Sequence, residues 1–163
     1  MKKIILSLSI LMLITGNVFS AGSSSSDDNA KTKSNYEKAV THIEAAKKHE
    51  KKGNLEKANN RYAKAQKLLI KSNDKKPNNA DTLNYLGFTT RKLGDFENGE
   101  KYYLQGLAID PNHKGINEYL GELYVATKRH NLAVERLEVL KGCDCKEYND
   151  LKAIIAGEKV SKY

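Results

Sequence analysis

Two short motifs recur in this chain at an offset of 34 residues. Pro77-Asn78 recurs as Pro111-Asn112, and Tyr85-Leu86-Gly87 recurs as Tyr119-Leu120-Gly121. Large apolar residues around these motifs follow helical spacing, which predicts two helices over residues 80–113. A hairpin of two amphipathic helices cannot bury its apolar stripe alone, so it becomes stable when it is stacked on further copies. The repetition therefore predicts an all-α array of stacked hairpins.

The hairpin over residues 80–113 has a turn at Leu93-Gly94-Asp95 and an end at Asp110-Pro111-Asn112. These residues resemble the tetratricopeptide repeat, whose pattern has Leu-Gly within the first helix, small residues in the second helix and Pro at the end. In this chain the corresponding positions hold Leu86-Gly87, Gly94, Gly99, Tyr103, Gly106 and Pro111. Gly stands at two helix-packing positions where the family usually has Ala, and we expect close helix approach to be the reason.

The resemblance implies an α-solenoid of about three tetratricopeptide hairpins, wound as a right-handed superhelix and closed by a capping helix. We expect the repeats at about residues 35–77, 78–113 and 114–145 and the capping helix at 147–162. The first repeat is longer than usual, because its turn residue Gly53 lies 41 residues before Gly94. The additional residues amount to about two helical turns, so they predict an extended second helix in the first repeat.

Residues 1–20 have the features of a signal peptide. Two lysines precede the apolar run Ile4–Ile14, which is too short to span a bilayer comfortably. We expect cleavage after Ser20, followed by a flexible Ser-rich linker over residues 21–34. The mature protein is then expected to be periplasmic or secreted. Retention of the apolar run as a membrane anchor is the alternative.

The first repeat is the basic end of the chain. The whole sequence carries a formal charge of +8, and the segment from Lys31 to Lys76 holds fourteen Lys or Arg against five Asp or Glu. One interpretation is an anionic partner, such as lipid head groups at an envelope surface. The other is a solvated Lys-rich helix face. Nucleic acid is not an expected partner, because an exported protein seldom meets it.

The sequence contains no Gly-rich phosphate loop, nucleophile elbow or paired-His metal helix. Its His, Cys and carboxylate residues lack the spacing of a recognised metal site. We therefore expect a protein that is not an enzyme and that binds no cofactor or metal. Cys143 and Cys145 are the two cysteines, and in an oxidising compartment they are a candidate disulfide. Such a disulfide either locks the local turn or supports a redox role.

The resemblance also implies a binding surface, because the first helices of stacked tetratricopeptide repeats line a concave groove that receives an extended peptide or a partner helix. Transferred by repeat position, the candidate groove residues are Ile43, Lys47, Lys51, Asn84, Phe88, Arg91, Lys92, Glu118 and Glu122. Phe88 is a candidate anchor, with Arg91 available for a partner carboxylate. The alternative is that Phe88 packs against the first helix of the next repeat. Asn84 sits one residue before the carboxylate-clamp position, so we do not expect recognition of a peptide C-terminus.

These features favour a non-enzymatic adaptor or scaffold of the bacterial cell envelope whose partner is a protein or peptide. Two alternatives remain open. The chain could bind a membrane surface or polyanion through the basic first repeat. It could instead be a redox-linked accessory protein that uses Cys143 and Cys145.

Overall fold

The computed structural model of this chain describes residues 33–161. The predicted signal peptide, the cleavage site after Ser20 and all but the last two residues of the predicted linker lie outside the described residues. Within this part Ser34 caps the first helix: its hydroxyl accepts a hydrogen bond from the backbone N–H of Glu37, and the Glu37 carboxylate accepts one from the backbone N–H of Ser34. The helical unit therefore begins sharply where the predicted linker ends.

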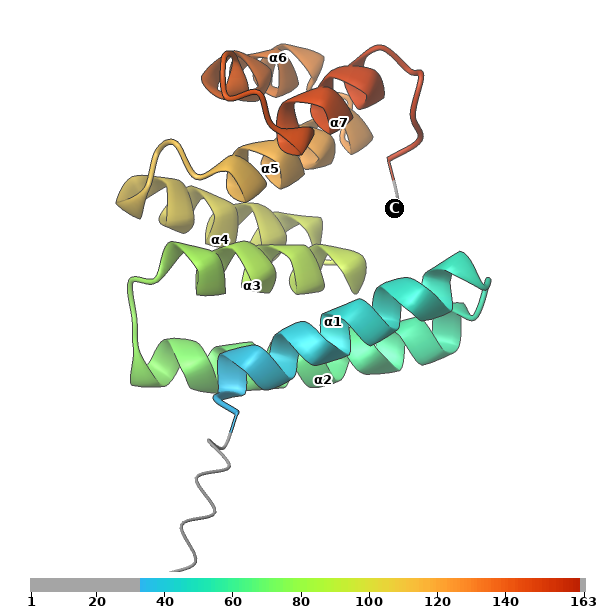
Figure 1. Cartoon of the computed structure of the whole chain (residues 1–163), viewed down its shortest axis with the longest axis vertical. Coiled ribbons are helices and arrows are strands. Elements are labelled where there is room, and N and C mark those ends of the chain that lie inside the picture. Colours follow the sequence, from blue (N-terminus) through green and yellow to red (C-terminus); the bar gives the residue numbers. More distant parts are fainter. Residues whose placement is uncertain (1–32, 162–163) are drawn as a thin grey trace, which may run out of the picture. The chain divides into compact units, whose positions relative to one another are not determined.

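Residues 33–161 contain seven helices and no strand (Figure 1). In chain order the helices are α1 (Asn35–Lys51), α2 (Leu55–Lys75), α3 (Ala80–Lys92), α4 (Phe96–Ile109), α5 (Lys114–Ala126), α6 (His130–Leu140) and α7 (Lys146–Ile155). Among these helices, none is both long enough and apolar enough to cross a membrane. As the sequence predicts, α2 is extended and runs on to Lys75.

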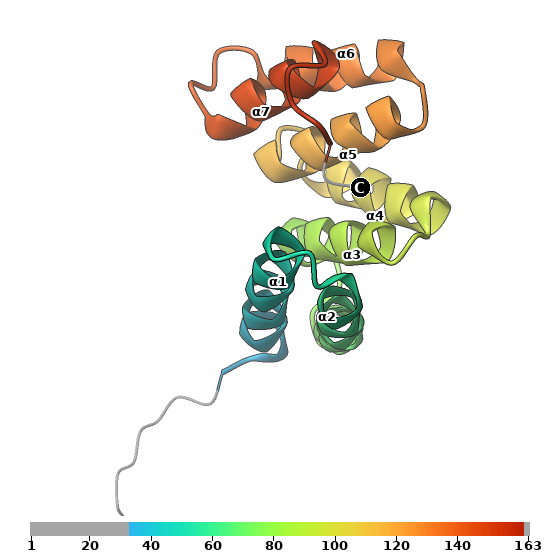
Figure 2. The ribbon, with the colours of Figure 1, turned by 90° about the vertical axis from the view of Figure 1, so that its right-hand side faces the viewer.

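The helices form three hairpins, α1–α2, α3–α4 and α5–α6, each packed along its length. Successive hairpins meet through α2 against α3 and through α4 against α5, and α7 packs on α5 and α6. Figure 2 shows the hairpins following one another in chain order. The predicted all-α solenoid with a helix covering its last hairpin is confirmed.

The last helix is shorter than predicted. The sequence predicts a capping helix over residues 147–162, whereas α7 ends at Ile155. Gly157 has a φ of +74°, a left-handed conformation that ends helices, and its N–H donates to the carbonyl of Ile154. The apolar pattern alone did not reveal this stop. The residues after it leave the helix and run toward the other hairpins (Figure 1).

Glycines allow the helices to pack closely, both within a hairpin and between hairpins. A Cβ atom on Gly87 of α3 would lie 2.5 Å from the ring of Tyr103 in α4, which is fully buried. A Cβ on Gly106 of α4 would collide with the side chain of Ile116 in α5. Close helix approach at Gly106 is thus confirmed, and it occurs where one hairpin meets the next.

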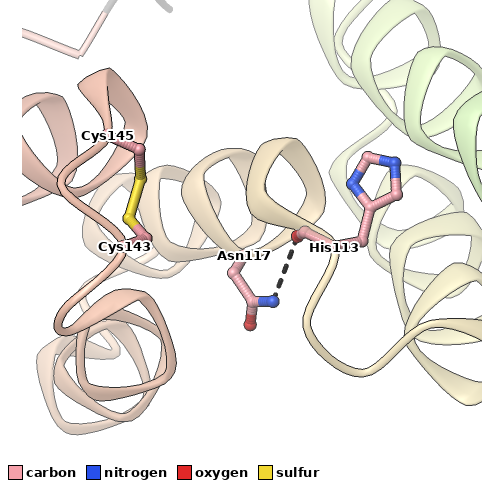
Figure 3. The surroundings of a disulfide bond; sticks show 4 residues. All are labelled: His113, Asn117, Cys143 and Cys145. Atoms are coloured by element: carbon pink, nitrogen blue, oxygen red, sulfur yellow. Dashed lines mark hydrogen bonds between the residues drawn. A yellow bond between two sulfur atoms is a disulfide. The ribbon is translucent and has the colours of Figure 1, made fainter.

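Cys143 and Cys145 form a disulfide in the loop between α6 and α7, with their Cα atoms 5.2 Å apart (Figure 3).

At the start of α5, the Asn117 side-chain amide donates hydrogen bonds to the carbonyls of His113 and Pro111. The Asn117 side chain is fully buried, so it fixes the turn that enters the third hairpin.

The three hairpins have different residues at the left-handed position of the turn between their two helices. Gly53 and Gly94 occupy the left-handed position in the first two hairpins, with φ of +73° and +94°. Lys128 occupies it in the third hairpin, with φ of +61°. A side chain with a Cβ atom is strained in this conformation, by roughly 1–2 kcal/mol. The third turn therefore carries a strain that the first two avoid.

We expect Lys128→Gly to raise the free energy of unfolding by about 0.5–1 kcal/mol, because Gly removes the strain but costs some chain entropy. The matched control is Lys128→Ala, which removes the charge and keeps the Cβ atom, and which we expect to give no such gain. Urea unfolding followed by circular dichroism measures both. An equal gain in the two variants would show that charge, and not backbone strain, is responsible.

Candidate partner-binding cavity

A cavity of about 570 Å³ lies on the side of the unit formed by the odd-numbered helices. Its lining residues come from α1, α3, α5 and α7, from the start of α2 and from the residues that follow α7. We call it the inner cavity. Its size falls within the range of about 300–1,000 Å³ that is typical of ligand pockets. It is the natural place to look for a partner of a stacked-hairpin protein.

Most of the candidate groove residues line the inner cavity. Seven of the nine do so: Lys47, Lys51, Phe88, Arg91, Lys92, Glu118 and Glu122. The other two do not. Ile43 is a buried member of the apolar core between the first two hairpins. Asn84 is buried beside Gly115 at the start of α5, where a Cβ on that glycine would come within 2.9 Å of the Asn84 amide nitrogen.

Phe88 forms part of the cavity wall and is 5% exposed. Its ring lies 5.0 Å from that of Tyr119 in α5 and 5.7 Å from that of Tyr62 in α2, measured between centroids. The Lys47 ammonium group sits 4.7 Å from the Phe88 centroid. Phe88 therefore packs between neighbouring helices, which is the alternative that the sequence left open, and truncating it would disturb the core.

Arg91 is not an exposed receptor for a partner carboxylate. Its side chain is 2% exposed, and its guanidinium group donates to the backbone carbonyl of Tyr119 at 2.6 Å and to the Glu122 carboxylate at 3.3 Å. Removing one member of such a buried pair leaves a charge without compensation. The Arg91–Glu122 pair thus joins α3 to α5 and forms the floor of the cavity.

A second polar group joins α1, α2 and α3. The Lys92 ammonium contacts the Glu50 carboxylate at 2.5 Å, and the Tyr62 hydroxyl donates to the same carboxylate at 2.8 Å. Burial and this hydrogen bond raise the pKa of Tyr62. Glu50 was not among the candidate residues, because its role depends on a lysine far along the sequence.

The residues after α7 form one side of the cavity, and the sequence did not identify them. Lys159 reaches Asp150 of α7 at 2.6 Å, and Lys146 contacts the same carboxylate. Neighbouring Val160 lines the cavity while 85% of its surface is exposed. Only the early end of α7 at Gly157 lets this segment turn toward the cavity.

Glu118 has the most unusual environment in the cavity. Its side chain is 7% exposed, yet it makes no hydrogen bond or ion pair with any residue from 33 to 161. Burial, followed by the charge of Glu122 one turn further along α5, raises the pKa of Glu118 from 4.5 to about 8. A large fraction of its carboxyl group is therefore neutral near pH 7.

The described residues contain no group of three or more His, Cys, Asp or Glu side chains placed to hold a metal ion. Cys143 and Cys145 are not lining residues of the inner cavity. The side chains that meet in the cavity are charged pairs, two further lysines, two aromatic rings, three aliphatic side chains and the Glu118 carboxyl group, which forms no ion pair within residues 33–161. This arrangement suits recognition of another molecule by contact.

Stacked helical hairpins with a cavity on one helical layer are typical of repeat proteins that serve as interaction modules. The family model of the tetratricopeptide repeat matches residues 80–113, which cover α3 and α4. The chain thus contains a tetratricopeptide repeat at α3–α4, and one helical hairpin precedes and another follows the matched unit.

Two solved structures are similar to this chain. The Arabidopsis OM64 TPR domain is 18% identical, with 77% of this chain and 99% of that chain covered and a TM-score of 0.48. The first TPR domain of Spaghetti (RPAP3), bound to the HSP90 peptide SRMEEVD, is 19% identical, with 76% and 94% covered and a TM-score of 0.49. No curated protein matches the sequence.

The environment of Glu118 makes stability depend on pH. The folded protein keeps the Glu118 proton up to about pH 8, whereas the unfolded chain loses it near pH 4.5. The contribution of this group to the free energy of unfolding is therefore full below pH 4.5 and declines as the pH rises toward 8. We expect Glu118→Gln to remove this part of the decline in urea unfolding measured across that range. The exposed variant Glu135→Gln is the control, and an unchanged slope in Glu118→Gln would contradict the assignment.

Proposed function

We propose that this protein is a non-enzymatic adaptor that binds an extended peptide or a helix of a partner protein in the inner cavity. The tetratricopeptide repeat fold is typical of protein–protein interaction modules and is generally not catalytic. The observation that carries the proposal is the cavity itself, which brings together side chains from α1, α3, α5 and α7. Its lining combines the rings of Phe88 and Tyr119, which are of a type enriched at interface centres, with charged side chains of the type found at interface rims.

The physical basis of binding is a rigid, partly desolvated surface. Phe88 and Tyr119 are held by neighbouring helices, and Arg91 is held by Glu122. Side chains that are already ordered lose little entropy when a partner arrives. Lys51 and Leu55 lie at the edge of the same cavity and are exposed, so they are available for further contacts.

We also propose that the protein is exported and acts in the bacterial cell envelope. The support is the sequence of residues 1–20, with lysines ahead of the apolar run Ile4–Ile14. N-terminal sequencing of the protein isolated from cells should find Ala21 as the first residue. Recovery of the chain with Met1 in a cytoplasmic fraction would contradict export. Binding to an anionic surface and a redox role for the cysteines stay predictions from the sequence.

Photo-crosslinking from single sites tests the adaptor function. A photoreactive residue in place of Leu55 or Val160, both exposed at the cavity, should capture the same partner in living cells. The matched controls are Leu104 and Val134, which are 48% and 44% exposed and are not lining residues. We expect no partner from the control sites. Equal capture from Leu104 and Leu55 would place the interface elsewhere and contradict the proposal.

A further inference from the structure

One carboxyl group of the inner cavity forms no ion pair within the described residues. Glu118 projects from α5 into the cavity wall, is 7% exposed, and makes no hydrogen bond or ion pair with any described residue. A largely buried carboxylate without an ion pair is costly, because it has lost much of its hydration and gained little interaction in return. In a binding protein such a group is the expected receptor for a complementary charge that the partner supplies.

The charged groups around Glu118 explain why none of them neutralises it. Glu122, one turn along α5, adds negative charge. Arg91 of α3 attracts Glu118 electrostatically, but its ion pair is with Glu122. From α7, Lys146 is the favourable neighbour, but its ammonium group contacts Asp150. The remaining neighbours are Glu147 on α7 and the hydroxyl groups of Tyr103 on α4 and Tyr119 on α5. The local surplus at this end of the cavity is therefore negative.

We propose that Glu118 binds a positively charged side chain, Lys or Arg, of the partner that occupies the inner cavity. This inference rests on the proposed function and specifies the chemistry of the partner. A primary ammonium or a guanidinium group is the complement of a single desolvated carboxylate. The partner is thus a peptide segment with a basic residue at the position that faces the junction of α5 and α7.

The cavity wall already accommodates cations next to its aromatic rings. The Lys47 ammonium group lies 4.7 Å from the Phe88 centroid, and the Arg91 guanidinium carbon lies 5.4 Å from that of Tyr119. Rings of this kind also pack against the methylene stem of a long basic side chain. A partner Lys or Arg can therefore bury its stem in the cavity and present its charge to Glu118.

Binding of a cation should depend on pH in a defined direction. The partner cation binds the ionised form of Glu118, so below pH 8 binding must release a proton. The apparent Kd should then weaken by about tenfold for each pH unit below the pKa of Glu118, because the binding-competent fraction falls by that factor. Above that pKa the affinity should level off.

The test uses the mature protein and a matched pair of peptides. The probes are acetyl-Ala-Ala-Lys-Ala-Ala-amide and the same peptide with norleucine in place of lysine, which keeps the stem and removes the charge. Binding is followed by the backbone NMR signals of α5 and α7. We expect at least about fivefold preference for the lysine peptide at pH 8, and a loss of that preference as the pH falls to 6.

The variant Glu118→Gln keeps the shape of the side chain, and Glu135→Gln is the control outside the cavity. Glu118→Gln should abolish both the preference for lysine and its pH dependence, whereas Glu135→Gln should retain both. Equal binding of the two peptides, an unchanged preference in Glu118→Gln, or no lysine-dependent shift up to about 10 mM peptide would overturn the inference.

Crosslinking separates this inference from the adaptor function. Glu118→Gln combined with the photoreactive residue at Leu55 should capture markedly less partner than the Leu55 protein alone. Undiminished capture would overturn the role of Glu118 and leave the adaptor function standing. If the Leu55 protein with an intact Glu118 captured no partner, that result would instead count against the adaptor function.

Discussion

The structure depends on how closely its packed helices can approach one another. At the seams between helices, Gly87 faces Tyr103, Gly106 faces Ile116 and Gly121 faces Leu151. A Cβ atom at any of these glycines would collide with its neighbour, so the absence of a side chain sets the spacing. Because these contacts fix α3 on α4, α4 on α5 and α5 on α7, they bring α3, α5 and α7 to a common side. The inner cavity is a consequence of this packing.

The inner side of the stack is polar, and its charges are mostly compensated within the protein. Arg91 of α3 is almost completely buried and is satisfied by the Tyr119 carbonyl and the Glu122 carboxylate of α5. Lys92 and Glu50 form a similar contact between α3 and α1. Such pairs contribute little net stability, because desolvation offsets their attraction. They do fix the position of one hairpin against the next, and so they give the cavity a defined wall.

The sequence predicted the helices and their stacking because these depend on local periodicity and on a repeated spacing. It did not predict which groove residues would be buried. Phe88 and Arg91 were assigned to the groove by their repeat position, and only for Phe88 was packing against the next hairpin kept as an alternative. Tyr119 of the following hairpin covers Phe88, and Glu122 pairs with Arg91. The sequence also did not show that Val160 lines the inner cavity. This placement depends on the early end of α7 and on a long-range contact between Lys159 and Asp150.

Glu118 and Glu122 are identical side chains on one helix, but their carboxyl groups have different electrostatic environments. They lie one turn apart on the same helix, but Arg91 forms an ion pair with Glu122, whereas Glu118 forms none with Arg91 or Lys146. The desolvation of Glu118 takes place during folding and lowers the stability of the free protein. A partner cation that reaches this carboxylate therefore gains the interaction without having to remove most of its water. Preorganisation of this kind moves part of the cost of recognition from the binding step to the folding step.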